Sequence, residues 1–391
     1  MPAASPILIA GAGIAGLAVA LGLARAGQPV CLLEKRQVLN ETGAGIQIGP
    51  NGVKALAWLG VRAAVEVNAF QPNRLSLFQA SSDVRLTTLP LASGRHGAPY
   101  LTLLRKDLQS ALLNVVMASS GVTLTPGFEV ADIETIDGQV MVRSADGRTA
   151  NGSALIGADG LWSRVRREIS PLAPRPTGYT AYRAVIPRQD LPPAFDAPDV
   201  GLRLSRNVHV VHYPVSGGGA LNVVAVVAGK SASQDWDEPG SLGDLTPFLA
   251  GCSAGLSGLL KRAPEWRRWP LFDLPKLSRW HSGRVVLTGD AAHPVLPFLA
   301  QGAVMALEDA VAMGQCVAAA GGFTPAVFER FASLRRGRTE RLARAARANG
   351  KTYHFSGVMG LARDSVLRST PPWLLIRGYD WLYGFDPVSE I

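Results

Sequence analysis

The sequence predicts an α/β fold in which one domain, built from discontinuous segments, carries an inserted, mainly β lobe and is followed by helices. Three observations predict this fold. Apolar strand-like runs alternate with helical segments in the first part of the chain. Alternating β-rich runs separated by glycines follow from about residue 179 to 275. Alanine-rich and arginine-rich segments without strand patterning begin near residue 303.

The same patterns set the expected domain boundaries. A chain of 391 residues is long enough for two lobes. We expect a discontinuous first domain, an inserted β-sheet lobe and a C-terminal helical segment. Their ranges are 1–70, 100–178 and 276–320 for the first domain, 71–99 and 179–275 for the lobe, and 321–391 for the helical segment.

The composition is that of a compact globular protein. Hydrophobic residues make up 47% of the chain and charged residues only 18%, which excludes a disordered chain. The cysteines are far apart and form no CxxC pair, and the histidines lack ligand spacing, so we expect neither a disulfide framework nor a metal site. The three cysteines are Cys31, Cys252 and Cys316.

The net charge of +9 raises the question of a polyanionic partner. Many of the cations fall in one alanine-rich stretch that predicts a long helix. We interpret them as a solvated helix face and expect no nucleic-acid partner, because no aromatic residues interleave them as a single-strand groove would require. A nucleic-acid or membrane patch is the alternative. The arginines are Arg330, Arg335, Arg336, Arg338, Arg341, Arg344 and Arg347.

The N-terminal stretch "ILIAGAGIAGLAVALGLARAG" resembles the apolar core of a signal peptide. No positive charge precedes it, and its glycines follow another pattern. No later segment is an uninterrupted apolar run of membrane length. We therefore expect an unexported, cytoplasmic protein without a membrane span.

That glycine pattern is GxGxxG, in the context of a dinucleotide-binding βαβ unit of the Rossmann type. Residues 6–10 and 30–33 are predicted strands, and residues 14–26 are a predicted helix between them. Because the motif lies between a strand and a helix, it predicts a bound dinucleotide, with a ligand-free glycine turn as the alternative. The motif alone does not separate NAD from FAD.

Each residue of this motif has a physical reason. Gly11 permits the tight turn, Gly13 lets backbone N–H groups approach a pyrophosphate, and Gly16 lets the helix pack closely on the strand. The helix N-terminus then faces the phosphates with its partial positive charge. Glu34 ends the second strand, where it can accept hydrogen bonds from an adenosine ribose.

Two further strand-like runs end in aspartates. "ALIGADGLWSRVRR" places Asp159 after the apolar run 154–156, and "RVVLTGDAAHPVLPFLAQG" places Asp290 after the run 285–287. Together with GxGxxG, these motifs resemble the single-component FAD-dependent aromatic hydroxylases, the p-hydroxybenzoate hydroxylase family. The likeness is greatest to its branch of salicylate hydroxylase, 3-hydroxybenzoate 6-hydroxylase and 6-hydroxynicotinate 3-monooxygenase. "GAGIQIGPNGVKAL" (43–56), "LLRKDL" (103–108) and "WLYGFDPV" (381–388) are also similar to that branch.

The resemblance implies an FAD site. By it, Asp290 contacts the ribityl chain, Asp159 belongs to a motif associated with FAD and the nicotinamide pyrophosphate, and Arg105 lies against the phosphate or ribityl region. The alternatives are that both aspartates only cap helices and that Arg105 forms a surface ion pair. Val304 and Met305 stand where many relatives carry an asparagine, so that turn is expected to contact the flavin through its backbone. The full expected set is Gly11, Gly13, Ala15, Gly16, Glu34, Lys35, Arg105, Asp159, Asp290, Gly302 and Ala303.

The segment "NVHVVHYPVSGGGALNVVAVVAG" predicts a β-hairpin closed by its glycine triplet. Strand alternation puts His209, Val211 and Tyr213 on one face and His212 on the other. Relatives in the branch carry a His and a Tyr at this spacing in the substrate pocket, so the resemblance implies catalytic roles for His209 and Tyr213. We interpret His212 as structural.

Three more residues are candidates for the substrate pocket: Gln47, Gln301 and Pro297. Pro297 is expected against the flavin, as a rigid residue without an N–H donor. For Gln47 a turn hydrogen bond is an equally good interpretation.

The resemblance also implies a reaction. NAD(P)H (NADH or NADPH, docking transiently) reduces FAD, and O2 then gives a C4a-hydroperoxide that hydroxylates a small phenolic or hydroxypyridine-type substrate. His209 is the expected base, because the pKa of a histidine lies near neutral pH. Alternatives are a flavoenzyme of this fold that performs epoxidation or dehydrogenation, and an FAD-containing binding protein that uses the basic helix. A monomer or homodimer is expected.

Overall fold

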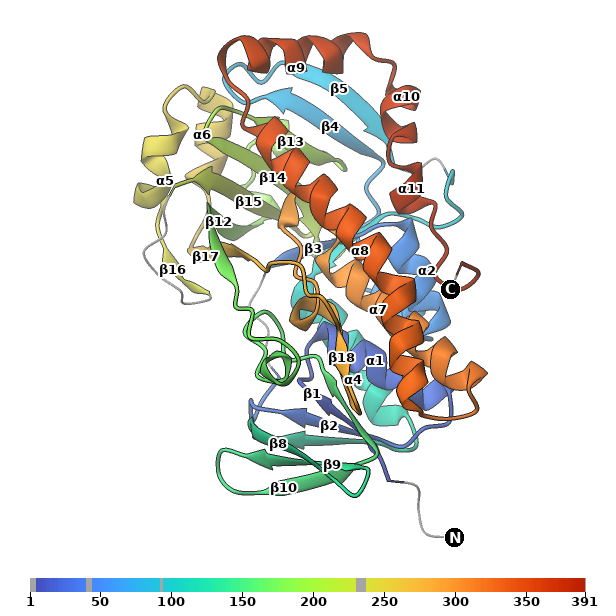
Figure 1. Ribbon diagram of the computed structural model, residues 1–391. Helices are drawn as coiled ribbons and strands as arrows, with labels where there is room; N and C mark the ends of the chain where they lie inside the picture. Colours follow the sequence, from blue (N-terminus) through green and yellow to red (C-terminus); the bar gives the residue numbers. More distant parts are fainter. Residues whose placement is uncertain (1–4, 40–43, 92–93, 230–236, 391) are drawn as a thin grey trace.

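The computed structural model describes residues 5–39, 44–91, 94–229 and 237–390, and these form two lobes joined by a long helix (Figure 1). A six-stranded sheet lies in the lower lobe of the view and an eight-stranded sheet in the upper one. Gly43 of the quoted segment lies outside the described residues. So do parts of the predicted ranges 1–70, 71–99, 179–275 and 321–391.

The six-stranded sheet has the strand order β18-β19-β11-β1-β2-β7 and is parallel except for β18. Its inner strands are continuous apolar runs because both faces of a parallel sheet are covered. The predicted βαβ unit is present as β1, α1 and β2, and every boundary agrees within one residue. The strands are β1 (Ile7–Ala10), β2 (Val30–Glu34), β7 (Val122–Pro126), β11 (Ala154–Gly157), β18 (His281–Ser282) and β19 (Val285–Leu287).

Helices and two small sheets surround this sheet. The core helix α7 packs against α1 and α8, and the small sheets pair β3 with β6 and order β10-β9-β8. The sequence did not indicate the three-stranded sheet. The elements are α1 (Ile14–Arg25), β3 (Gly45–Ile48), α2 (Pro50–Trp58), α3 (Arg62–Glu66), β6 (Leu101–Leu104), α4 (Arg105–Ala118), β8 (Val130–Ile136), β9 (Gln139–Ser144), β10 (Thr149–Gly152) and α7 (Gly302–Ala319).

The eight-stranded sheet has the order β16-β17-β12-β15-β14-β13-β4-β5, so two separate chain segments build it. The predicted hairpin is present: β14 pairs antiparallel with β15 across a turn at Ser216–Gly218. Helices α5 and α6 pack on one face through leucines that belong to the same buried cluster as Val208 and Val210. The elements are β4 (Arg74–Gln79), β5 (Arg85–Pro90), β12 (Arg175–Pro187), β13 (Val200–Leu204), β14 (Val208–Val215), β15 (Ala220–Ala228), β16 (Glu238–Gly240), α5 (Leu242–Leu249), α6 (Ala254–Leu260) and β17 (Trp266–Asp273).

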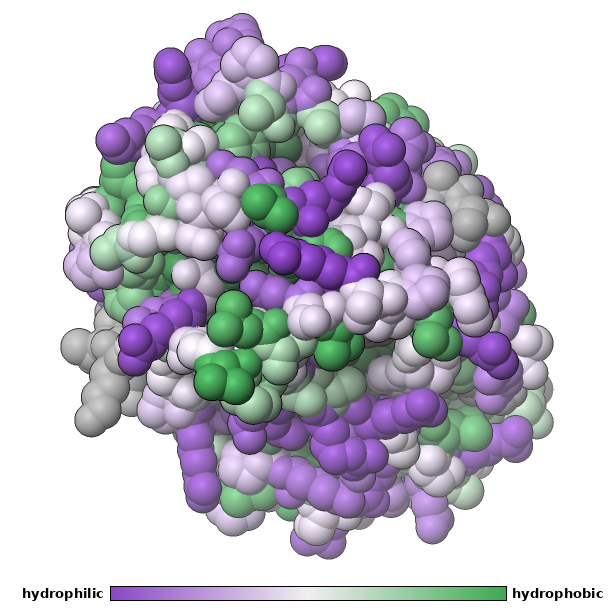
Figure 2. Space-filling model, turned by 90° about the horizontal axis from the view of Figure 1, so that it is seen from above, coloured by the Kyte–Doolittle hydropathy of each residue, from purple (hydrophilic) through white to green (hydrophobic). Residues whose placement is uncertain are grey.

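The chain ends in four helices: α8 (Pro325–Tyr353), α9 (Gly357–Ser369), α10 (Pro372–Arg377) and α11 (Asp380–Tyr383). Helix α8 runs from beside α7 up to the eight-stranded sheet, and α9 lies across the top of the upper lobe (Figure 1). Seen from that end, the surface mixes hydrophilic residues with scattered hydrophobic ones (Figure 2).

The prediction of a solvated arginine face on α8 is wrong for Arg335, which is fully buried. Its Nε donates to Asp309 Oδ1 at 2.7 Å, and its Nη1 lies 2.9 Å from Glu308 Oε2. Arg338 also pairs with Glu308. A buried cation requires partners of this kind.

The two carboxylates lie on α7, which is long and apolar enough to cross a membrane. However, 72% of its 18 residues are buried inside the protein, as is usual for a core helix.

Candidate active site

A cavity of about 280 Å³ lies between the two lobes. The glycine loop, the residues after β19 and the start of α7 line one side. The strands β12, β14, β15 and β17 line the other side. The topology thus brings chain segments that are far apart in sequence to one space, whose volume is close to the lower end of the range for small-molecule sites.

The glycine loop after β1 is shaped by close backbone contacts. Gly11 has φ +98°, and a Cβ there would lie 2.6 Å from the carbonyl oxygen of Ala158. A Cβ on Gly16 would lie 1.8 Å from the carbonyl oxygen of Gly11. Gly13 differs, because a Cβ there meets nothing within 4 Å, and both Gly13 and Ala15 line the cavity. The loop therefore leaves open space at the N-terminus of α1, where backbone N–H groups attract an anion.

Glu34 ends β2 against this loop. Its Oε2 accepts the N–H of Ala12 at 2.7 Å, and its Oε1 accepts the N–H of Arg36 at 2.9 Å. These bonds hold the buried carboxylate beside the glycine loop. Lys35, next in the chain, is exposed.

Asp159 follows β11 and caps the short 3₁₀ helix that begins at Val165. Its Oδ2 accepts the N–H groups of Arg164 and Val165 at 2.7 and 3.0 Å, so the capping interpretation holds. Its Oδ1 is buried and has no hydrogen-bond partner among the described residues. Capping and ligand contact are therefore compatible.

Asp290 follows β19 in a tight turn, in which Gly289 has φ +55°. Its side chain lines the cavity together with Arg105, the first residue of α4. The surrounding protein desolvates this carboxyl and raises its pKa, while Arg105 and His293 oppose the shift. Asp290 is nevertheless exposed to the cavity, so water still reaches its charge and the desolvation effect is partial.

A buried ion network of Asp309, His293 and Arg335 supports the turn that carries Asp290. Asp309 Oδ2 accepts the N–H of Gly289 at 3.0 Å and the hydroxyl of Thr288 at 3.1 Å, and it lies 2.6 Å from Nε2 of His293. Arg335 pairs with the other oxygen of this carboxylate. Burial alone would raise the pKa of Asp309, but His293 and Arg335 outweigh it and hold the pKa below its usual range. Asp309 is thus an anion that fixes the turn.

A second branch of the network reaches the start of α7. Asn51 Nδ2 donates to Glu308 Oε1 at 2.8 Å and to Gln301 Oε1 at 3.0 Å. Gln301 is buried, lines the cavity and has an Nε2 without a partner among the described residues. The preceding residue, Ala300, has φ +52°, a left-handed conformation that non-glycine residues rarely adopt. Gly302 and Ala303 complete this wall of the cavity.

The opposite wall carries the residues predicted on one strand face. His209, Val211 and Tyr213 of β14 line the cavity. His212 points away from it: Nε of Arg203 donates to its Nε2 at 3.4 Å, and its ring packs on Phe195. Burial and the Arg203 charge lower the pKa of His212 to about 3. The alternation predicted from the sequence is therefore found in the strand.

His209 and Tyr213 are both buried and uncharged at neutral pH. Burial, and then the neighbouring His354, lower the pKa of His209 well below its usual value. Burial raises the pKa of Tyr213, against the opposing effects of Arg183 and of a hydrogen bond with Gln47. The expectation that the pKa of His209 lies near neutral pH is therefore wrong: burial keeps the ring neutral and able to accept a proton, but makes it a weaker base than a free histidine. Tyr213 keeps its proton and can donate a hydrogen bond.

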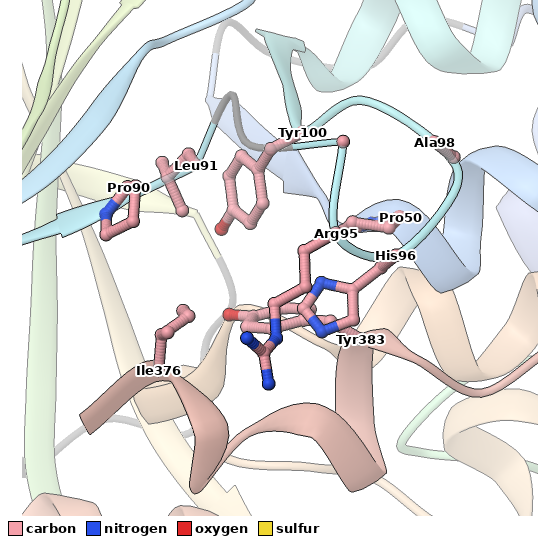
Figure 3. Close-up of a pocket in the computed structure, with 10 residues that line it drawn as sticks. Pro50, Pro90, Leu91, Arg95, His96, Ala98, Tyr100, Ile376 and Tyr383 are labelled. Atoms are coloured by element: carbon pink, nitrogen blue, oxygen red, sulfur yellow. The ribbon is translucent and has the colours of Figure 1, made fainter. Parts of the chain in front are cut away.

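Gln47 links Tyr213 to a second tyrosine, since its Oε1 accepts the hydroxyl of Tyr100 at 2.9 Å. Tyr100 stands edge-on to Tyr383 of α11, with ring centroids 5.9 Å apart, beside Arg95 and His96 (Figure 3). The pocket between them measures about 10 Å³, which is at the lower limit for one water molecule. The substrate candidates therefore belong to the inter-lobe cavity. Pro297 lies there too. No motif in the sequence marked Arg183 or His354, and Asn51 lies in the quoted segment 43–56 without having been singled out.

The comparison with known proteins decides the family. A family model described as an FAD binding domain matches residues 4–346. The chain belongs to this family.

The chain is 34% identical to a 3-hydroxybenzoate 6-hydroxylase of Polaromonas naphthalenivorans over 388 residues, which cover 98% of this chain and 97% of that protein. It is also 34% identical to the 3-amino-4-hydroxybenzoate 2-monooxygenase PtmB3 of Streptomyces platensis, covering 98% of this chain and 97% of the relative. A salicylate hydroxylase substrate complex matches with a TM-score of 0.85 and 26% identity, over 100% of this chain and 98% of that one. Klebsiella pneumoniae HpxO complexed with FAD and uric acid matches with a TM-score of 0.82 and 26% identity, over 95% of both chains.

The protein is accordingly an FAD-dependent aromatic hydroxylase, a monooxygenase that uses NAD(P)H as its reductant. The geometry of the cavity fits the cofactor. The open space at Gly13 admits a pyrophosphate, and Gln301, which lines the cavity, has a buried Nε2 donor without a protein partner among the described residues. The buried Oδ1 of Asp159 also has no partner among those residues, but Asp159 is not part of the cavity lining. Such groups need a ligand to satisfy them.

Proposed function

We propose that this hydroxylase acts on a phenol that bears a carboxylate, of the hydroxybenzoate class. Among the residues that the structure describes, two cations line the cavity, Arg105 from α4 and Arg183 from β12. Arg105 lies beside Asp290, on the side of the glycine loop, whereas Arg183 of β12 acts on Tyr213. Arg183 therefore supplies a positive charge next to the proposed phenol-binding residues, where a substrate carboxylate would be stabilised. The relatives named as hydroxybenzoate hydroxylases support this substrate class.

Within this proposal, the first set of residues holds the cofactor. Gly11, Gly13, Ala15 and Gly16 shape the loop for the pyrophosphate, and Glu34 with Lys35 lies at the adenosine end. Asp159, Arg105 and Asp290 would contact the phosphates and the ribityl chain, and Gly302 with Ala303 would contact the ring through backbone groups. Bound FAD, reduced by NAD(P)H, supplies the activation of O2 from which one oxygen atom enters the substrate ring and the other leaves as water.

The second set of residues handles the substrate. His209 accepts the phenolic proton, which makes the ring carbons ortho and para to the oxygen more nucleophilic. Tyr213 donates a hydrogen bond to the substrate, and Gln47 orients that hydroxyl. Gln301 and Pro297 shape the side of the cavity next to α7. The apolar side chains of Val211, Val224 and Val226 keep water from the reacting atoms.

One observation carries the proposal: a neutral histidine and a protonated tyrosine face the same cavity as the Asp290 turn. NAD(P)H oxidation and product formation under labelled O2 should be measured with hydroxybenzoates, hydroxypyridines and carboxylate-free phenols. We expect hydroxybenzoates to react best and to gain one labelled oxygen atom. Products without label would favour dehydrogenation, and labelled epoxides would favour epoxidation.

Three variants test the residue roles. His209→Phe should keep FAD bound and reducible but lose most hydroxylation, and Tyr213→Phe should weaken substrate binding by about 0.5–1.5 kcal/mol, the range for one neutral hydrogen bond. His212→Gln is the matched control on the opposite strand face, where a loss of stability is expected without a loss of coupling. Wild-type hydroxylation by His209→Phe would show that the proposed base is wrong.

We further propose that the protein acts in the cytoplasm as a monomer or homodimer. Cell fractionation and sedimentation velocity of the FAD-loaded protein test these two points.

A further inference from the structure

His354, immediately after the end of α8, contacts the proposed base from behind. Its Nε2 lies 2.9 Å from Nδ1 of His209, and the two ring centroids are 5.1 Å apart. His209 lines the cavity, whereas His354 is not part of the lining. The bond therefore occupies Nδ1 of His209 and leaves Nε2 as the nitrogen available to a substrate.

The surroundings of this pair are aromatic. The ring of His209 packs on Tyr353 and Phe298, with centroids 5.2 and 5.5 Å away. The ring of His354 packs on Tyr179, at 5.2 Å. Two imidazolium ions in contact would repel each other strongly among these aromatic side chains, which screen charge poorly. The pair therefore holds at most one extra proton.

The charged and titratable groups that face the pair are Tyr179 of β12, Tyr353 of α8 and Arg363 of α9, which is itself paired with Asp364. Arg363 donates from Nη1 to the carbonyl oxygens of Thr352 and Tyr353 at 3.2 and 2.9 Å, which places its charge beside His354. Burial first, and then Arg363, lower the pKa of His354 to about 4, although the Val226 backbone opposes the shift. His354 is therefore neutral at pH 7 and has one N–H.

The Val226 backbone indicates where that N–H lies. A backbone group that raises the pKa of a histidine is a carbonyl near a ring N–H. Because Nε2 of His354 faces His209, Nδ1 is the nitrogen left for this carbonyl. Nδ1 of His354 has no hydrogen-bond partner of normal geometry among the described residues, whereas Nε2 is held 2.9 Å from Nδ1 of His209, so the two neutral rings share one proton between these nitrogens. If His209 is the base and its Nε2 is unprotonated, that proton lies on Nδ1 of His209, and the N–H of His354 is on its own Nδ1. A protonated Nδ1 leaves Nε2 of His354 as a hydrogen-bond acceptor.

We propose that His354 is a positioning residue that accepts the Nδ1–H of His209 and so keeps Nε2 of His209 unprotonated toward the cavity. This inference rests on the proposed function of His209 as the base. The tautomer of a histidine is set by the hydrogen bond that its other nitrogen makes. When Nε2 takes the phenolic proton, the imidazolium keeps an acceptor at Nδ1, and the neutral His354 adds no opposing charge.

Nitrogen-15 NMR of the FAD-loaded protein with labelled histidine tests the tautomer without any turnover. The chain has six histidines, so the spectrum is small, and His209→Phe assigns the relevant signals. We expect a protonated Nδ1 and an unprotonated Nε2 on His209 in the wild type at pH 7. His354→Leu should lose this preference, and His354→Gln should retain it, because its side-chain oxygen can accept the same N–H. His281→Gln, on the half-buried strand β18, is the control and should leave the His209 signals in place.

Activity gives the second readout. His354→Leu should hydroxylate roughly 2- to 12-fold more slowly, the equivalent of one lost hydrogen bond, and release more hydrogen peroxide, with an altered pH profile. FAD content and flavin reduction by NAD(P)H should match the wild type, and His354→Gln should restore much of the rate. A wild-type His209 protonated at Nε2, or an unchanged His209 spectrum in His354→Leu, would overturn the inference. If the wild-type protein hydroxylates no hydroxybenzoate, the proposed function is wrong, but the protonation of His209 observed by NMR is not affected by that outcome.

Discussion

Arg335→Met tests whether the buried ion network supports the cofactor turn. The change keeps the length and the apolar stem of the side chain but leaves Asp309 and Glu308 without their shared, fully buried cation. Removing one partner of a buried pair costs about 3–5 kcal/mol. With an unfolding entropy of about 2.1 cal/mol/K per residue for a chain of 391 residues, the melting temperature should fall by about 4–6 °C. Arg344→Met on the same helix is the matched control, because Arg344 is exposed and lies 4.0 Å from Glu340, a contact worth little.

The assay is thermal unfolding of the FAD-loaded protein, followed by circular dichroism at several pH values, together with the FAD content of each variant. The depressed pKa of Asp309 means that its ionisation stabilises the fold above the unfolded value of about 3.9, and that this contribution is lost as the pH falls through the lower folded value. Without Arg335 the folded pKa rises, so the variant should lose stability at a higher pH during acidification than the wild type does. If Arg335→Met unfolds at the same temperature as Arg344→Met and retains all of its FAD, the proposed support of the turn is wrong.

The remaining predictions concern the cofactor loop. Gly16→Ala should fold poorly and lose FAD, because its Cβ would collide with the Gly11 carbonyl. Gly13→Ala should fold normally but bind FAD more weakly, because its Cβ would meet no protein atom and would occupy the open space of the loop. The melting temperature and the flavin-to-protein absorbance ratio distinguish the two variants. Glu34→Ala should weaken FAD binding by about 1–3 kcal/mol, measured by titration of the apoprotein, because a charged hydrogen-bond acceptor is lost. Asp290→Ala should also reduce FAD retention, and a wild-type dissociation constant in both of these variants would contradict the assigned cofactor positions.

The sequence predicted the parts of this protein that depend on local pattern. The βαβ unit and the β14–β15 hairpin follow from periodicity and glycine spacing, and the face alternation of His209 and His212 follows from the two-residue repeat of a strand. Family resemblance added the two aspartate motifs. None of these inferences required knowledge of which distant segments meet.

The features that the sequence did not predict depend on contacts between segments that are far apart in the chain. Arg335 was assigned to solvent because buried arginines are rare without partners, and its partners lie on another helix. One signal was available, since "MALEDAVAM" places two adjacent acids in an otherwise apolar helix that must be buried. His354 carried no comparable signal, because no motif surrounds it and its role exists only where α8 reaches the upper sheet.

Helix α8 connects these two unpredicted features. Arg335 and His354 are separated by 19 positions, which is about 28 Å along a helix. Arg335 of this helix pairs with the carboxylates that fix the Asp290 turn, and His354, just beyond the end of the helix, contacts His209. The same helix thus supports the proposed cofactor side and, through His354, the proposed substrate side of one cavity, although it contributes no residue to the lining. Substitutions at the two positions should therefore have different effects. A substitution of Arg335 should reduce FAD binding, whereas a substitution of His354 should leave FAD bound but increase oxygen consumption that is not coupled to hydroxylation.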